Sequence, residues 1–179
     1  MNKLTLKGKS WMIMLLAVFA FTACDDDDDD IVLDELTAEE FVNQAAVNNL
    51  FEIETSNLAL QNAETEEVEQ FAEQMIEDHT TASAELTALA SSKGIAVPTT
   101  LPQEEQATRN RLAALNGIPF DKDYMTVQVE AHEEAVALFQ RAVDELDDAE
   151  LRFFAEQTLP ILEEHLVMAR ELKEVTDEL

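Results

Sequence analysis

The chain contains three histidines, and each lies on the apolar side of a different predicted helix. Residues three, four and seven positions apart share one face of an α-helix, so the neighbours at these spacings report which way a side chain points. The apolar neighbours are Ala72, Met75, Ile76, Ala82 and Leu86 for His79; Met125, Val129, Ala135, Val136 and Phe139 for His132; and Ile161, Leu162, Met168, Ala169 and Leu172 for His165. All three imidazoles are therefore predicted to point into a common core.

A carboxylate from a fourth helix is predicted to join them. Glu54 has apolar neighbours at helical spacing, namely Val47, Leu50, Phe51 and Leu58. Glu52 lies above the small residues Ser56 and Ala59, so it is a second candidate for an inward orientation. The spacing leaves the choice between Glu52 and Glu54 open.

Imidazole and carboxylate groups together are suitable ligands for zinc, iron, copper or manganese. Burying polar groups costs free energy unless they are paired, so one shared polar centre is the economical arrangement. The sequence thus predicts a metal site made by His79, His132 and His165 with Glu52 or Glu54. A hydrogen-bonded histidine cluster without metal is the competing interpretation, and in that case no cofactor is needed.

Each histidine also has an acidic residue beside it in the sequence, namely Asp78, Glu133 and Glu164. Consecutive residues on a helix point about 100° apart, so these side chains are poorly placed to bind the same ion as their neighbour. We expect them to orient an imidazole by hydrogen bonding or to lie in solvent.

Other kinds of catalytic chemistry find little support in the residues. The only cysteine is Cys24, no serine stands in a recognisable nucleophile motif, and Tyr124 is the only tyrosine. We therefore expect a binding protein rather than an enzyme. Two alternatives stay open: an envelope stress or interaction protein with structural histidines, and a metal-dependent oxidoreductase.

Helix-breaking residues divide the chain into segments that position these side chains. Capping residues, glycines and prolines predict long helices over about 37–62, 65–94, 121–145 and from 148 to near the C-terminus, with a short helix over about 103–115. Pro160 is expected to kink or interrupt the last helix. No strand-like alternation is visible, so the predicted fold is an all-α four-helix bundle with a short extra helix between the second and third long helices.

Several motifs resemble the DUF4142 family of exported bacterial proteins. They are Asn49-Leu50-Phe51-Glu52-Ile53, Leu58-Ala59-Leu60, Phe71-Ala72 with Met75-Ile76 and Asp78-His79-Thr80, Phe120-Asp121-Lys122-Asp123-Tyr124-Met125, Ala131-His132-Glu133, and Thr158-Leu159-Pro160 leading to Glu164-His165-Leu166. The likeness covers about residues 37–175 and implies a ferritin-like bundle whose biochemical role is not established. Ferritin-like di-iron enzymes use Glu-x-x-His motifs. Here Ile76, Val129 and Leu162 precede the histidines by three residues, so a mononuclear site is expected instead.

The first residues predict export. Lys3, Lys7 and Lys9 precede an apolar run over 11–21, which is typical of a secretory signal and too short for a membrane-spanning helix. Phe21-Thr22-Ala23-Cys24 resembles a bacterial lipobox, which implies cleavage before Cys24 and attachment of lipid to its thiol. The predicted organisation is a signal peptide over 1–23, an acidic tether over 24–36 and the bundle over 37–179. The protein is then expected at the outer membrane, facing the periplasm or the cell surface.

Charge limits the partners of the chain. The formal net charge is −28 at pH 7, so nucleic acid and anionic lipid surfaces repel it, and the expected membrane contact is the lipid on Cys24. Asp25 to Asp30 form an unbroken acidic run, which is expected to be a solvated tether. Loose calcium binding is a second interpretation. The run also resembles the acidic sorting signals of Bacteroidetes surface lipoproteins.

Overall fold

The computed structural model describes residues 35–179, and this part of the chain contains five α-helices and no other regular element. The helices are α1 (Ala38–Asn62), α2 (Glu66–Lys93), α3 (Gln103–Leu112), α4 (Ile118–Glu145) and α5 (Ala149–Asp177). The predicted signal peptide and nearly all of the predicted tether, Cys24 included, lie outside the described residues. No helix within residues 35–179 combines the length and the apolar character needed to cross a membrane.

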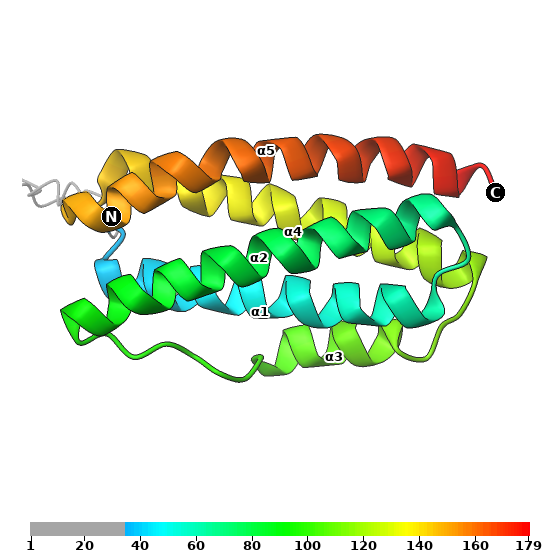
Figure 1. The fold of residues 1–179 in the computed structure, drawn as a ribbon, viewed down its shortest axis with the longest axis horizontal. Helices are drawn as coiled ribbons and strands as arrows, with labels where there is room; N and C mark the ends of the chain where they lie inside the picture. Colours follow the sequence, from blue (N-terminus) through cyan, green and yellow to red (C-terminus); the bar gives the residue numbers. More distant parts are fainter. Residues whose placement is uncertain (1–34) are drawn as a thin grey trace, which may run out of the picture. The chain divides into compact units, whose positions relative to one another are not determined.

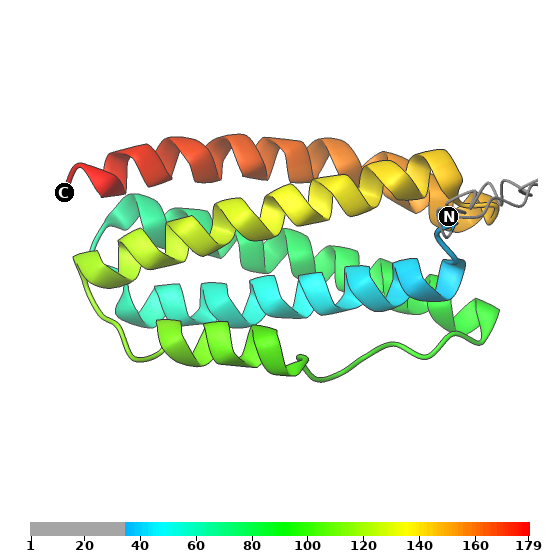
Figure 2. The same cartoon turned by 180° about the vertical axis from the view of Figure 1, so that it is seen from behind.

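Four long helices form a bundle of two antiparallel pairs (Figure 1). α1 pairs with α2 and α4 pairs with α5, while α1 packs on α4 and α2 on α5. Because α2 and α4 run in the same direction, the chain must return along the bundle between them, and this return contains α3. Figure 2 shows α3 on the outside of the bundle beside α1, where it also contacts α4. The predicted four-helix bundle with an extra short helix is confirmed.

The helix ends follow the capping residues that the sequence displays. Thr37 accepts a hydrogen bond from the backbone N–H of Glu40 at 3.2 Å, and the Glu40 carboxylate accepts one from the backbone N–H of Thr37 at 3.0 Å, which together form a capping box. α2 ends at Gly94, whose φ of 71° is left-handed, and Asp148 caps the N-terminus of α5. Local chemistry thus fixes these three ends of the long helices.

Two boundaries differ from the predicted ones. α4 begins at Ile118 rather than near residue 121, because Pro119 lies in the first turn, where a helix does not need its missing N–H. α3 ends at Leu112 rather than 115, and the following residues form turns in which the backbone N–H of Leu115 donates to the carbonyl of Leu112.

The predicted interruption at Pro160 is not observed, since α5 continues through it. Proline removes the hydrogen bond to the carbonyl four residues earlier, which here belongs to Glu156. Both Pro160 and Glu156 are exposed, so water can satisfy that carbonyl and the helix is able to continue.

The core consists of two apolar clusters with a polar layer between them. One cluster contains Phe41, Leu86, Phe139 and Phe154, and extends to Leu36, which the sequence had placed in the tether. The other is built around Phe71, Met75, Phe120 and Tyr124. On each of the four long helices, buried polar residues separate the stretches that belong to the two clusters. These buried polar residues include Asn49, Glu52, Thr55, Ser56, His79, Gln128, His132 and His165.

Candidate metal centre

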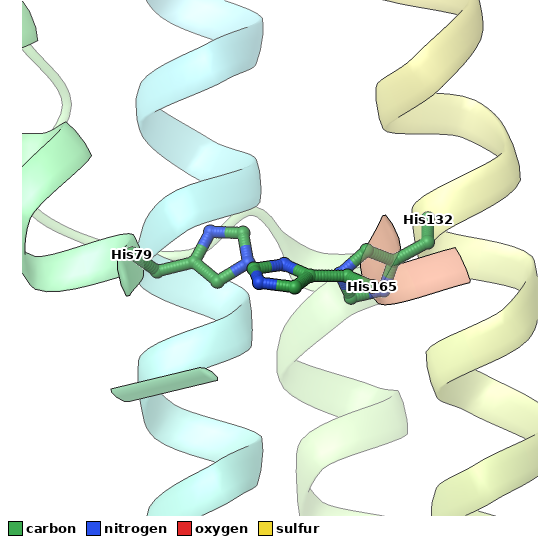
Figure 3. A group of neighbouring side chains, drawn as sticks. All are labelled: His79, His132 and His165. Atoms are coloured by element: carbon green, nitrogen blue, oxygen red, sulfur yellow. The ribbon is translucent and has the colours of Figure 1, made fainter. Parts of the chain in front are cut away.

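The three histidines meet in the middle of the bundle, as predicted. His79 comes from α2, His132 from α4 and His165 from α5, and their side chains point toward one another (Figure 3). Ring centroids lie 5.5–5.7 Å apart, and one ring nitrogen of each histidine lies within 4.8 Å of those of the other two. The residues are only 3%, 1% and 1% exposed, so the cluster is shielded from bulk water.

The ring nitrogen of His132 that faces away from the other two histidines, its outer nitrogen, is held by the backbone of its own helix. Its Nδ1 lies 2.9 Å from the carbonyl oxygen of Gln128. A carbonyl can only accept, so Nδ1 must carry the hydrogen and donate it. In the neutral ring this leaves the lone pair on Nε2, the nitrogen that can bind a metal.

His79 and His165 are held in the same way by side chains. Nδ1 of His79 donates to Oδ1 of Asn49 at 2.9 Å, and Nε2 of His165 donates to Oδ2 of Asp78 at 3.0 Å. Histidines that bind metals almost always donate their other ring N–H to a carbonyl or carboxylate, which fixes the ring orientation. All three histidines therefore have the hydrogen bonds that ligands require.

The second nitrogen of every ring is buried and has no hydrogen-bond partner among the described residues. These atoms are Nε2 of His79, Nε2 of His132 and Nδ1 of His165. Each carries a lone pair in the neutral ring, and a buried acceptor without a partner is costly. A cation between the rings would satisfy all three at once.

Burial also favours the neutral form of His79 and His165. The pKa of His79 is well below its ordinary value, because burial disfavours the charged ring and because His132 and His165 would add neighbouring positive charge. The pKa of His165 is lowered by burial and by His132, against the opposing effect of Asp78. Neutral imidazoles are the form that binds metals.

Glu52 lies beside the centre rather than in it. The residue is 3% exposed, and its Oε1 is 3.9 Å from Nδ1 of His132, the nitrogen that faces away from the other histidines. Burial raises the pKa of the Glu52 carboxyl, and nearby His132 and Gln128 lower it. Glu52 can supply compensating negative charge at this distance. Its carboxylate does not belong to the set of possible ligand atoms that lie within 4.8 Å of one another, which consists of the three histidines.

Glu54 does not face the histidines. Its carboxylate forms an ion pair with Arg109 of α3 at 2.8 Å, and its side chain is 35% exposed. Of the apolar neighbours that suggested an inward orientation, Phe51 is buried in the core, whereas Val47, Leu50 and Leu58 are only partly buried. Leu50 lines a surface pocket with residues of the α2–α3 connection. α1 is therefore covered on two sides, which its sequence pattern could not distinguish.

The acidic sequence neighbours behave differently from one another. Asp78 orients an imidazole as expected, but it binds His165 across the bundle rather than its neighbour His79. Glu133 instead pairs with Arg170 on the surface. Sequence reasoning missed Asn49, although it lies on the stripe formed by Ala45, Ala46, Asn49, Glu52, Ser56 and Ala59 at helical spacing.

Comparison with known proteins supports the fold. A family model described as "Domain of unknown function (DUF4142)" matches residues 31–172. None of the curated proteins matches the chain.

Three solved structures have a similar fold. A DUF305 protein from Streptomyces coelicolor is 14% identical, with a TM-score of 0.68 over 78% of this chain and 92% of that one. A DUF305 fragment from Deinococcus radiodurans is 15% identical, with a TM-score of 0.67 over 79% and 95%. A third structure, described as CopM in the Cu(II)-bound form, is 17% identical, with a TM-score of 0.66 over 78% and 97%. Identities this low establish a shared fold alone.

Proposed function

The chain belongs to the DUF4142 family, and we propose that it binds one transition-metal ion in the middle of the bundle through His79, His132 and His165. The observation that carries the proposal is the set of three buried ring nitrogens that face one another without partners. In a purely structural cluster we would expect the inner nitrogens to be hydrogen-bonded, as most buried polar atoms are. Here only the outer nitrogens are.

Copper is the first metal to test. An all-imidazole donor set suits copper, zinc, iron and nickel, whereas manganese prefers oxygen ligands. Cu(II) binds most tightly of the common divalent ions to a given nitrogen site. The similar bundle of CopM is known in a Cu(II)-bound form, which supports this choice. Asp78 and Glu52 lie close enough to balance part of the positive charge of a buried ion.

The direct experiment measures metal content and affinity on the untagged protein. Elemental analysis after purification, followed by titration with Cu(II) and with Zn(II), is expected to give one ion per chain. The electron paramagnetic resonance spectrum of the Cu(II) form should show coupling to nitrogen. A spectrum with oxygen ligands alone would contradict the proposal.

The control variant replaces His79, His132 and His165 with glutamine together. It keeps all 39 acidic residues, so it reports adventitious cation binding to the surface. The wild type should hold at least ten times more tightly bound metal than this variant. Equal metal contents would leave a structural role as the better explanation of the cluster.

We propose a binding role rather than a catalytic one, and the loaded protein allows a test. Ferroxidase and catalase assays on the Cu(II) and iron forms should give no turnover above that of the triple histidine variant. Turnover that disappears with the histidines would favour the metal-dependent oxidoreductase instead.

We also propose that the bundle works in the cell envelope, attached to the outer membrane by lipid on Cys24. The support is the order of basic residues, apolar run and Phe21-Thr22-Ala23-Cys24 in the sequence. Two acyl chains give stable membrane attachment. Mass spectrometry of the mature protein should find Cys24 acylated, and Cys24→Ser should move the protein from the membrane fraction to the soluble fraction. Protease added to intact cells then separates a surface location from a periplasmic one.

A further inference from the structure

An acidic surface pocket reaches Glu52, the carboxylate beside the histidine centre. It lies between α1, α3 and α4 and has a volume of about 260 Å³. Its lining residues include Glu52, Glu104, Glu105, Glu130 and Glu134, with Arg111 engaged by Asp123. α3, the helix outside the four-helix bundle, contributes Glu104 and Glu105 to it.

The most buried carboxylate that lines this pocket is incompletely paired. Glu52 lines the pocket although the residue is only 3% exposed, and its Oε2 has no hydrogen-bond partner among the described residues. Oε2 of Glu105 is likewise buried without a partner there. Two free oxygens in an acidic pocket are suitable contacts for a cation in transit.

The histidine centre is closed along the axis of the bundle. Apolar clusters fill the bundle on both sides of the polar layer, and an ion cannot cross them without losing all of its polar contacts. An ion must therefore enter sideways, between helices. On the side of α1 and α4, Glu52 connects the pocket to His132 through a separation of 3.9 Å.

We propose that the acidic pocket beneath α3 is the route by which a divalent cation reaches the three histidines, with Glu52 as the buried oxygen ligand on the way. This inference rests on the proposed metal-binding function. Glu104, Glu130 and Glu134 collect the hydrated ion at the mouth, and Glu52 replaces part of its water before it passes His132. The route accounts for a buried carboxylate that the three-histidine centre does not use as a ligand.

The first experiment measures the rate of Cu(II) uptake by stopped flow on the full chain. Replacing the exposed Glu104, Glu130 and Glu134 with glutamine removes the charge at the mouth and leaves the histidines intact. The matched control replaces Glu163, Glu171 and Glu174, three exposed acidic residues of α5 outside the pocket. Uptake is expected to slow about tenfold in the pocket variant alone, within the range of electrostatic steering by a charged cleft. Equal slowing of both variants, or of neither, would overturn the proposal.

The second experiment blocks the pocket sterically. Thr108 lines it from α3, whereas the adjacent Ala107 is exposed and does not. Thr108→Trp should slow Cu(II) uptake at least tenfold while the stoichiometry at equilibrium stays at one, and Ala107→Trp should leave the rate unchanged. Unaltered uptake in Thr108→Trp, with circular dichroism showing the fold retained, would exclude this route. Absence of Cu(II) binding at equilibrium in the wild type would instead refute the metal site itself.

Discussion

At the scale of single residues, the donors around the rings determine what the histidine centre can do. A backbone carbonyl, an amide oxygen and a carboxylate each accept the hydrogen from one ring nitrogen. These three bonds select the tautomer in which the inner nitrogens carry lone pairs. The proposed ligand set is thus prepared by groups that accept hydrogen bonds from the opposite side of each ring.

Asp78 provides the clearest test of this orientation. Asp78→Ala should lower the affinity for Cu(II) about 10–100-fold, the usual cost of removing a partner of a ligating histidine. Asp78→Asn keeps an acceptor oxygen without the charge, so its affinity for Cu(II) should lie between those of Asp78→Ala and the wild type. The adjacent exposed residue offers a control, since Glu77→Gln should bind like the wild type. Isothermal titration measures all four, and equal affinities for Asp78→Ala and the wild type would contradict the orienting role.

The buried rings also predict how stability depends on pH when metal is absent. Folding lowers the pKa of His79 and His165 below the ordinary value of 6.5. Below that pH the unfolded chain takes up protons that the folded chain refuses, so the free energy of unfolding falls as pH drops from about 6.5. The slope is about 1.4 kcal/mol per pH unit for each proton.

Urea denaturation between pH 5 and pH 8, with chelator present, measures this slope. His79→Gln removes one of the two groups, so its stability should change less steeply below pH 6.5. Above that pH, where both states hold the rings neutral, the two curves should run parallel. Identical slopes throughout would show that the rings do not titrate as their burial requires.

At the scale of the helices, the sequence predicted the elements well because their signals are local. Thr37 with Glu40, Gly94 and Asp148 each act within one turn, and the structure uses all three. Whether Glu52 or Glu54 faces the core is not decided by local sequence. It depends on α3 covering a second side of α1, through contacts such as the pair between Arg109 and Glu54.

The partners of the histidines were harder to foresee for the same reason. Asp78 reaches His165 across 87 positions of sequence, and Asn49 reaches His79 across 30. Periodicity reports which way each side chain points but not which helix it meets. The three histidines could be predicted because an inward direction was enough to bring them together.

Gly117 sets the start of α4 and with it the register of His132. Its φ of 64° and ψ of −151° fall in a region that is essentially restricted to glycine, and its N–H donates to the carbonyl of Asn62. Gly117→Ala should lower the free energy of unfolding by about 1–3 kcal/mol. Gly94 has a left-handed conformation with open space around its α-carbon, so Gly94→Ala should cost less. Urea denaturation compares them, and an equal or smaller loss at Gly117 would contradict this ranking.

At the scale of the whole molecule, the charge of −28 acts on every folded state whether or not metal is bound. Like charges repel one another across the compact domain, and salt screens them: the Debye length falls from about 30 Å at 0.01 M to about 8 Å at 0.15 M. Raising NaCl over this range should therefore raise the melting temperature. Because the triple histidine variant has the same acidic surface, its melting temperature should rise with NaCl by the same amount as that of the wild type.

Metal bound at the proposed histidine site is expected to stabilise the protein differently from salt. An ion that binds only the folded state adds about 2.7 kcal/mol when its free concentration is 100 times the dissociation constant. Thermal melts in 0.15 M NaCl, where surface charges are already screened, should then show a further rise with Cu(II) in the wild type alone. A Cu(II)-dependent rise of the same size in the triple variant would assign the effect to the acidic surface. If NaCl raises the melting temperature of both proteins equally but Cu(II) raises only that of the wild type, the effect of salt is separate from that of metal. The metal would then lie among the three rings.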